Sequence, residues 1–368
     1  MHFAQTDLLP RDAMVKDLFR PIAHLFEIPG VTEIAINRPG EAFTEAGPRW
    51  QRHEIPSLTF EQCFSMAQTV ASYTQQSVDQ THPIVSARLP HGERIQIVVP
   101  PAVEQEHVSM TIRIPDPKTR ELEQYRNEGF FSRFVWGRSP RLEQKRRDLK
   151  QVDMKLVRLL EENDVVGFLK LAIRARKNIA VVGDTGSGKT TLMKAMCPYI
   201  PHDERLVTIE DVRELFLPHL NSVNLLYSKG GQGVAKVTPA DLISSNMRMK
   251  PDRVLLAELR GGEAFDFLKL LTTGHSGSIT SYHAESCALA WDRYVFMAKE
   301  HEQAAIYDEA ALKRLIALTI DIIIHVEVEK VYDDNDEPIR KDRYVSEIHF
   351  DPVAKLVARF GDSQIHHA

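Results

Sequence analysis

A glycine-rich segment that follows a short apolar run restricts the fold of this chain more than any other feature. Residues 179–182 predict a buried strand, and residues 192–196 are good helix formers. Between them the chain matches the pattern G-x-x-x-x-G-K-[ST]. The segment reads Gly183, Asp184, Thr185, Gly186, Ser187, Gly188, Lys189, Thr190 and Thr191. Strand, glycine-rich turn and helix in this order are the context that a phosphate-binding loop requires.

The chemistry of this segment suits a nucleoside triphosphate. Its glycines allow successive backbone N–H groups to point inward and bind an anion, and the following helix adds the positive end of its dipole. We expect Lys189 to reach the β- and γ-phosphates and the hydroxyl of Thr190 to ligate Mg²⁺. The alternative is a glycine-rich turn that matches by chance. Because the full motif stands in its proper context, we predict binding of a nucleoside triphosphate with Mg²⁺.

The bulk composition is that of an ordinary globular protein. The chain has 368 residues, enough for roughly two or three domains, and its net charge of −5 provides no overall basic field for nucleic acid. Its three cysteines are widely spaced, which indicates reduced thiols in the cytosol. The first residues lack a secretory signal pattern, and no apolar run is long enough to cross a bilayer. We therefore expect a cytoplasmic protein without a transmembrane segment, whose membrane association is peripheral.

Residues 1–128 predict a small α+β domain. Apolar positions at helical spacing run from residue 12 to residue 26, and Pro21 is expected to divide that helix. The other predicted elements are a helix at residues 60–73 and strands at residues 31–36, 94–99 and 108–113. This domain carries no catalytic motif of its own.

Residues 129–151 form a connection of different composition. Seven basic residues stand in this strip, at Arg133, Arg138, Arg141, Lys145, Arg146, Arg147 and Lys150, with Phe131, Phe134 and Trp136 among them. One interpretation of residues 131–150 is a surface for anionic lipid head groups or nucleic acid. The other is a solvated linker whose aromatic side chains dock on a neighbouring domain. The length of the connection also suggests that neighbouring subunits exchange domains.

Residues 152–368 predict an α/β domain. Strands alternate with helical segments, a pattern typical of a parallel sheet that helices cover on both faces. The predicted strands lie at residues 179–182, 207–209, 253–257 and 278–282, and a hairpin follows over residues 322–332 and 343–350. Ligands bind such sheets at the carboxyl ends of the strands, which is where the phosphate-binding motif stands.

Acidic residues follow the ends of these predicted strands, at Glu210, Asp211 and Glu258. We predict that Glu258 either holds Mg²⁺ through water or polarises the attacking water, with Glu210 as the competing candidate for the base. Both glutamates are therefore candidate Mg²⁺ ligands beside Thr190. The alternative for these acids is salt bridges to nearby arginines. His283, after a further strand, is predicted to sense the γ-phosphate by hydrogen bonding.

Four ordered motifs resemble those of a known family. They are the phosphate-binding loop and, in order along the chain, the segments at residues 208–215, 254–261 and 274–284. They are similar to the Walker A, Asp-box, Walker B and His-box motifs of the secretion traffic ATPases, the superfamily of the general secretory pathway ATPases. The branch that the chain resembles most is the hexameric cytoplasmic ATPase of type IV secretion systems. The resemblance extends to the N-terminal half, at residues 31–40, 89–94 and 110–113.

The resemblance implies a RecA-like ATPase domain in a ring of six subunits, with ATP and Mg²⁺ held between the N- and C-terminal domains. It implies that Arg94 and Arg113 approach the nucleotide, where an arginine facing the γ-phosphate stabilises the transition state. Without the resemblance, both would be ordinary charges on edge strands. The implied activity is ATP hydrolysis in a bacterial secretion motor at the inner membrane, with membrane components of the machinery as partners. Protein export, pilus assembly and DNA transfer stay open as its output.

Two further interpretations stay open. The phosphate-binding loop and the strip at 131–150 are compatible with a nucleic-acid translocase or helicase-type ATPase, which single-stranded DNA would stimulate in a salt-dependent manner. The second interpretation is a nucleotide-gated assembly scaffold with negligible turnover of ATP. Steady-state phosphate release distinguishes that scaffold from an enzyme.

Overall fold

The structure, a computed structural model, describes residues 10–115, 120–227 and 236–361. The chain divides into two units. The first is formed mainly by Met1–Pro117, together with Ser228–Val237 and Lys330–Lys341, and the second by Lys118–Tyr227, Thr238–Glu329 and Asp342–Ala368. The division thus falls ahead of the domain boundary predicted near residue 128, because residues 120–128 pack with the second unit.

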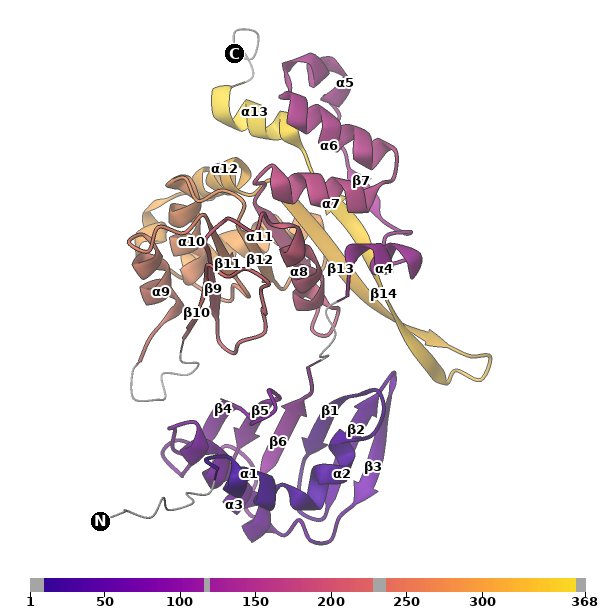
Figure 1. The fold of residues 1–368 in the computed structure, drawn as a ribbon, viewed down its shortest axis with the longest axis vertical. Helices are drawn as coiled ribbons and strands as arrows, with labels where there is room; N and C mark the ends of the chain where they lie inside the picture. Colours follow the sequence, from indigo (N-terminus) through magenta and orange to yellow (C-terminus); the bar gives the residue numbers. More distant parts are fainter. Residues whose placement is uncertain (1–9, 116–119, 228–235, 362–368) are drawn as a thin grey trace, which may run out of the picture. The chain divides into compact units, whose positions relative to one another are not determined.

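The first unit is built on an antiparallel sheet (Figure 1). Its strands lie side by side in the order β3-β2-β1-β6-β5-β4, and every neighbouring pair is antiparallel. They are β1 (Val31–Ile36), β2 (Glu41–Ala46), β3 (Arg49–Glu54), β4 (Ile84–Arg88), β5 (Arg94–Val98) and β6 (Ser109–Arg113). The sequence predicted β1, β5 and β6, which are the strands at or next to the centre of this sheet.

Short helices complete the first unit. The helix predicted over residues 12–26 is divided as expected, into α1 (Ala13–Leu18), the 3₁₀ turn η1 (Arg20–Ile22) that contains Pro21, and α2 (Ala23–Phe26). The longer helix α3 (Phe60–Tyr73) begins where the Thr59 hydroxyl accepts a hydrogen bond from the Gln62 N–H at 3.2 Å. Its buried residues recur at helical spacing and enter the core of this unit, at Cys63, Met66, Ala67 and Val70.

The second unit is built on a larger sheet in the order β10-β9-β11-β12-β8-β13-β14-β7. Its strands are β7 (Val135–Gly137), β8 (Ile179–Gly183), β9 (Leu206–Glu210), β10 (Ser222–Leu226), β11 (Arg253–Leu256), β12 (Ile279–Tyr282), β13 (Ile322–Tyr332) and β14 (Pro338–His349). The pairs from β10 to β13 are parallel, which confirms the predicted parallel sheet.

Helices cover both faces of this sheet (Figure 1). Along β8, Ile179 and Val181 enter one core, and Ala180 and Val182 enter the other, because successive side chains of a strand point to opposite faces. The first core lies under α4 (Leu122–Asn127), α5 (Leu142–Lys145), α6 (Gln151–Glu161), α7 (Val165–Arg174), α8 (Lys189–Met196) and α13 (Pro352–Phe360). The second lies under α9 (Pro239–Asn246), α10 (Glu263–Thr272), α11 (Cys287–Lys299) and α12 (Glu309–Thr319).

Residues 129–151 pack on the core of the second unit. Phe130 and Phe131 are buried in the first of its cores, and the Trp136 indole donates a hydrogen bond to the Phe350 carbonyl at 3.1 Å. The segment also supplies β7, which pairs with β14. The aromatic residues therefore dock, as one of the two interpretations of this strip expected. The suggestion of domain exchange, which depended on a long extended connection here, loses its support.

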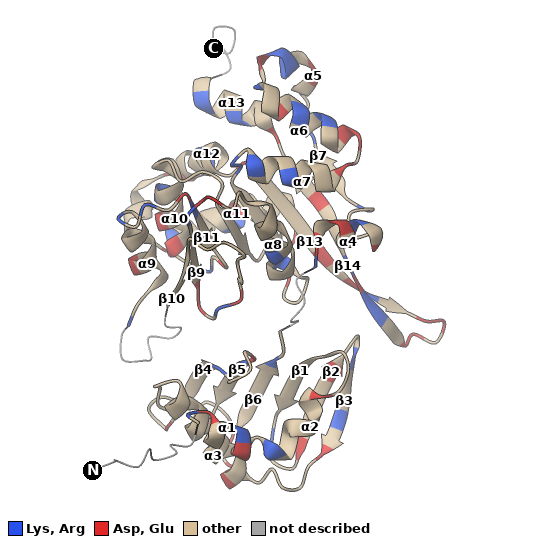
Figure 2. Ribbon diagram, viewed as in Figure 1, with Lys and Arg blue, Asp and Glu red and all other residues tan. Residues whose placement is uncertain are grey.

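The basic residues of the same strip lie among acidic ones. Arg133 forms ion pairs with Glu329 at 3.2 Å and with Asp342 at 3.6 Å, and Arg146 pairs with Glu161 at 2.5 Å. Arg138 and Lys145 have acidic partners as well. Figure 2 shows acidic and basic residues interspersed on α6. The described contacts thus tie much of this charge to the fold of the second unit.

A buried arginine joins the elements at the amino ends of the parallel strands. Arg253, the first residue of β11, is fully buried and forms a two-point ion pair with Glu204, at 2.5 and 3.0 Å. The same guanidinium donates to the carbonyls of Ile173, at 2.7 Å, and Gly277, at 3.4 Å. The end of α7 and the loop before β12 are therefore held to one side chain.

Replacement of Arg253 with Met is expected to destabilise the second unit by about 3 kcal/mol, because the largely buried Glu204 carboxylate would lose its two-point partner and keep the longer contact with Arg176, at 3.5 Å. The melting temperature of the purified protein measures this loss. The exposed Arg174→Met serves as the control. Adding Glu204→Gln to Arg253→Met should recover part of the loss, and a wild-type melting temperature for the single variant would contradict the prediction.

Candidate active site

Four neighbouring parallel strands bring the predicted site residues to one edge of the sheet. β9 ends at Glu210, β11 is followed by Glu258, β12 by His283, and β8 by the phosphate-binding loop. These strands are adjacent in the order β9-β11-β12-β8. The carboxyl ends of parallel strands share one edge, so the sequence-predicted acids, the histidine and the loop meet there.

The phosphate-binding loop is shaped by its glycines. Gly183, Gly186 and Gly188 have φ angles of +147°, +75° and +101°, a region that residues with side chains rarely adopt. Gly183 has a second constraint, since a Cβ atom there would lie 2.1 Å from the carbonyl oxygen of Val326 on β13. The loop therefore requires glycine at this position on two independent grounds.

The interior of the loop fits an anionic ligand. The Lys189 side chain is buried, and its ammonium donates to the carbonyls of Gly183 and Asp184, each at 2.9 Å. The Ser187 hydroxyl is fully buried and has no hydrogen-bond partner among the described residues. A buried hydroxyl without a partner is costly, and a phosphate oxygen would satisfy it. Thr190 and Thr191 follow in the first turn of α8, half-buried.

His283 connects the loop to Glu258. Its Nε2 lies 3.0 Å from Oε1 of Glu258, and its Nδ1 lies 3.4 Å from the Lys189 ammonium. An ammonium only donates, so Nδ1 accepts from Lys189 and the proton of a neutral imidazole is on Nε2, facing the carboxylate. The three predicted residues thus form one line from the phosphate-binding loop to the acid after β11.

Arg260 contacts Glu258 on the side away from His283, and it is one of the nearby arginines expected as alternative salt-bridge partners of these acids. Its guanidinium contacts Oε2 of Glu258 at 2.5 and 2.9 Å and Asp211 at 3.1 Å. Burial lowers the pKa of Arg260, but the charges of Asp211 and Glu258 outweigh that effect and raise the pKa above its ordinary value. The two interpretations of Glu258 are therefore compatible. Its carboxylate forms a salt bridge with Arg260, and it also lies at the end of a strand in the site.

Glu210 lies at the predicted strand end but faces a different set of groups. It is fully buried, and it accepts hydrogen bonds from the Thr208 hydroxyl at 2.9 Å and from the backbone N–H groups of Glu214 and Leu215 at 2.7 and 2.9 Å. Burial raises the pKa of Glu210, while the two backbone hydrogen bonds oppose that shift. Its carboxylate thus holds the loop after β9 in place.

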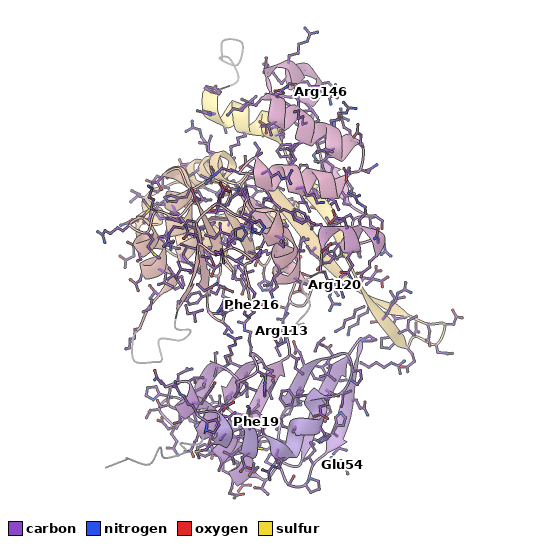
Figure 3. All side chains as sticks on the ribbon, viewed as in Figure 1. Phe19, Glu54, Arg113, Arg120, Arg146 and Phe216 are labelled. Carbon is purple, nitrogen blue, oxygen red and sulfur yellow. The ribbon has the colours of Figure 1, made fainter. Side chains whose placement is uncertain are left out.

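Two positions predicted from the resemblance lie in the first unit. Arg94 begins β5 and Arg113 ends β6, and the two are directly opposite each other in the antiparallel register. Figure 3 labels Arg113. On its other side Arg113 is paired in register with Glu33 of β1. Neighbouring strands thus bring the two arginines together, although they are distant in the sequence.

A buried histidine on β13 adjoins the site, and no sequence motif pointed to it. His325 is 6% exposed and is paired in register with Val182, immediately before the loop. Its Nδ1 lies 2.5 Å from the Ser346 hydroxyl on β14, and it hydrogen bonds to the backbone of Ala284, next to His283. Burial lowers the pKa of His325. This side chain thus links the last two strands to the His-box.

Comparison with known proteins gives the family. Residues 139–349 match the family described as "Type II/IV secretion system protein". The chain belongs to this family. The matched region contains the whole of the site at the edge of the larger sheet.

Members of the secretion family resemble this chain over nearly its whole length. The type IV secretion system protein VirB11 of Brucella suis is 41% identical over 348 residues, 94% of this chain and 92% of that protein. PtlH of Bordetella pertussis is 40% identical over 304 residues, 81% of this chain and 85% of the relative. The fold is accordingly RecA-like, with a smaller N-terminal domain.

Solved structures agree with this assignment. The VirB11 ATPase from the Brucella suis type IV secretion system, in complex with sulphate, has a TM-score of 0.51 and 42% identity, covering 93% of this chain and 99% of that one. The pilus retraction motor PilT with bound ADP has a TM-score of 0.56 at 16% identity, covering 93% of this chain and 85% of its own, and shares the fold. No helix among the described residues is long and apolar enough to span a bilayer.

Replacement of Gly183 with Ala tests the constraint at the loop. The new methyl group would meet the Val326 carbonyl, so we expect a loss of about 1–3 kcal/mol in addition to backbone strain. Gly186→Ala is the control, because its φ, at +75°, is also positive but the space around the new atom is open. The melting temperature should fall further for Gly183→Ala, and equal values for the two variants would refute the role of Val326.

Proposed function

We propose that this secretion family member is an ATP-hydrolysing motor subunit of a bacterial type IV secretion system. The observation that carries the proposal is the continuous line from Lys189 through His283 to Glu258, beside a phosphate-binding loop. The names of its relatives, which are type IV secretion system proteins, support the same assignment.

The loop and Lys189 would bind the triphosphate. Backbone N–H groups that line a glycine-rich turn bind phosphate oxygens, and the N-terminus of α8 adds its dipole. The Lys189 ammonium, which donates to two carbonyls of the loop, would exchange these oxygens for those of the β- and γ-phosphates. The buried Ser187 hydroxyl would gain a partner in the same step.

Two side chains would hold Mg²⁺ at this site. The Thr190 hydroxyl follows Lys189 at the start of α8 and would ligate the ion directly, whereas Glu258, after β11, would reach it through a water molecule. Glu210, also predicted as a ligand, has both oxygens engaged by Thr208, Glu214 and Leu215, so we assign it to the loop after β9. A bound Mg²⁺ ion would offset the charge of the phosphates.

Glu258 is the better candidate for the group that polarises the attacking water. Its carboxylate is partly exposed, at 22%, whereas Glu210 is fully buried. His283 and Arg260 contact separate oxygens of Glu258 and would fix its orientation. Hydrolysis of a phosphoanhydride depends mainly on positioning and on charge neutralisation. A carboxylate that is held from two sides would position the attacking water. His283 would report the state of the γ-phosphate to this acid through Lys189.

Assembly and location belong to the same proposal. Six copies would form a ring on the cytoplasmic face of the inner membrane and act with membrane components of the secretion machinery. Arg94 and Arg113 would reach a bound nucleotide with their paired positive charges. Opening and closing of the domains during hydrolysis would then drive protein export, pilus assembly or DNA transfer.

Glu258→Gln should lower the kcat for ATP hydrolysis by about 10²-fold or more while nucleotide affinity stays near that of the wild type, because the amide is a poor proton acceptor of similar shape. Lys189→Ala should lose affinity and turnover together. Phosphate release and the binding of a fluorescent ATP analogue measure the two quantities. Hydrolysis by Glu258→Gln at the wild-type rate would move the base assignment to Glu210.

Arg94→Ala and Arg113→Ala should each lower kcat by at least about tenfold, because each removes a cation that we assign to the transition state. Arg120→Ala, which lies in the second unit and pairs with Glu128, is the control. Melting temperatures verify folding. If both variants hydrolyse ATP as fast as this control, the assignment of the two arginines is wrong.

A further inference from the structure

The phosphate-binding loop has a contact with a side chain from the last strand of the sheet. Arg343 on β14 donates a hydrogen bond from Nε to the carbonyl oxygen of Gly186, at 2.9 Å. Its Cδ lies 3.7 Å from the position that a Cβ atom of Gly188 would occupy. The side chain therefore crosses one glycine of the loop and is bonded to another.

The anchor of this side chain is firm. Val345 lies two residues further along β14, on the same face as Arg343, and is fully buried in the first core of the second unit. Its N–H donates to the Phe130 carbonyl at 2.8 Å. Arg343 thus extends from an immobilised strand to the loop.

Gly186 is the least closely packed of the three loop glycines. It has a φ of +75°, and no atom lies within 4 Å of the place where its Cβ would be. A glycine in open space has no side chain and no packing to select one orientation of the following peptide plane. The bond from Arg343 to the Gly186 carbonyl supplies that selection.

The orientation matters because the peptide is planar and trans. The Gly186 carbonyl and the Ser187 N–H belong to one plane and point in opposite directions. With the carbonyl held by Arg343, the Ser187 N–H points into the loop, where it donates to the Asp184 carbonyl at 3.3 Å. The Lys189 ammonium donates to the same oxygen at 2.9 Å. Two donors thus converge on one carbonyl oxygen inside the loop, so the direction of the Ser187 N–H is part of the hydrogen bonding that shapes it.

We infer that Arg343 is a positioning residue that sets the direction of the Ser187 N–H and so preorganises the loop for phosphate. It acts through the Gly186 peptide, by a hydrogen bond and not by its charge. The inference deepens the proposed function and, for its effect on ATP binding, rests on it. A flipped peptide would turn a carbonyl oxygen toward the phosphates and would weaken their binding.

Two substitutions separate the hydrogen bond from the charge. Arg343→Ala removes both, whereas Arg343→Gln places an amide N–H donor at the same distance along the side chain without the charge. The exposed Arg174→Ala, before β8 and at the opposite end of that strand, is the control for loss of a surface cation. Melting temperatures of all the variants establish that the fold is kept.

The first measurement is amide hydrogen exchange over residues 183–191 without nucleotide. We expect exchange on the order of tenfold faster in Arg343→Ala, which corresponds to the loss of one hydrogen bond, and near wild-type exchange in Arg343→Gln. Wild-type exchange in the Ala variant overturns the inference. This measurement does not require that the protein bind ATP.

The second measurement is the Kd for Mg-ATP. We expect it to rise on the order of tenfold in Arg343→Ala and to return near the wild-type value in Arg343→Gln. Equal losses in both variants would assign Arg343 to charge attraction and overturn the positioning role. Wild-type protein with no affinity for Mg-ATP would refute the proposed function instead, and the exchange measurement would still decide the inference.

Discussion

The close approach of Gly183 to the carbonyl of Val326 is the contact on which the site depends. β8 and β13 are parallel neighbours whose register places these two residues side by side, so the loop leaves the sheet directly against the next strand. Only a residue without a side chain fits there. The turn can then begin while β8 is still buried on both faces, and the N–H groups after it stay at the edge where the acids of β9 and β11 also end. The sheet positions the chemistry, because the registers of β8 with β12 and of β12 with β11 set where the loop lies relative to Glu258.

The charges at this edge form a chain in which each group orients the next. Lys189, His283, Glu258, Arg260 and Asp211 alternate between donor and acceptor, with contacts of 2.5–3.4 Å. Interactions in a partly buried network are stronger than in water, and a member without a partner is costly. The network therefore favours one orientation of the Glu258 carboxylate, which contacts both His283 and Arg260. Glu210 is fully buried and binds the backbone of the neighbouring loop, so the acids at the two strand ends have different surroundings.

Local signals in the sequence were sufficient for the core of the site and insufficient for its surroundings. The phosphate-binding loop, Glu258 and His283 were predictable because each follows an apolar strand, and parallel strands end at a common edge. Most of the strands that were not predicted lie at sheet edges or are very short: β3 exposes nearly all its side chains, β10 is only half-buried, and β7 has three residues. The exception is β2, which lies between β3 and β1 and was also not predicted. Arg343 and His325 were not predicted as site residues for a different reason. Their partners Gly186 and Ala284 are distant in sequence, and only the register of β13 and β14 brings them to the site.

The basic strip shows how composition alone misdirects. Seven cations in one segment favoured a nucleic-acid or lipid surface, yet its aromatic residues are part of the core and Arg133 and Arg146 have acidic partners distant in the sequence, Glu329 and Glu161. Surface ion pairs stabilise little individually, but here they accompany a strand pairing and buried aromatic rings that already fix the segment. A translocase would need cations directed along a groove to follow a phosphate backbone. Charge that is tied to neighbouring acids serves that purpose poorly, and the strip is better explained as the stabilising cover of β14, the strand that carries Arg343 to the loop.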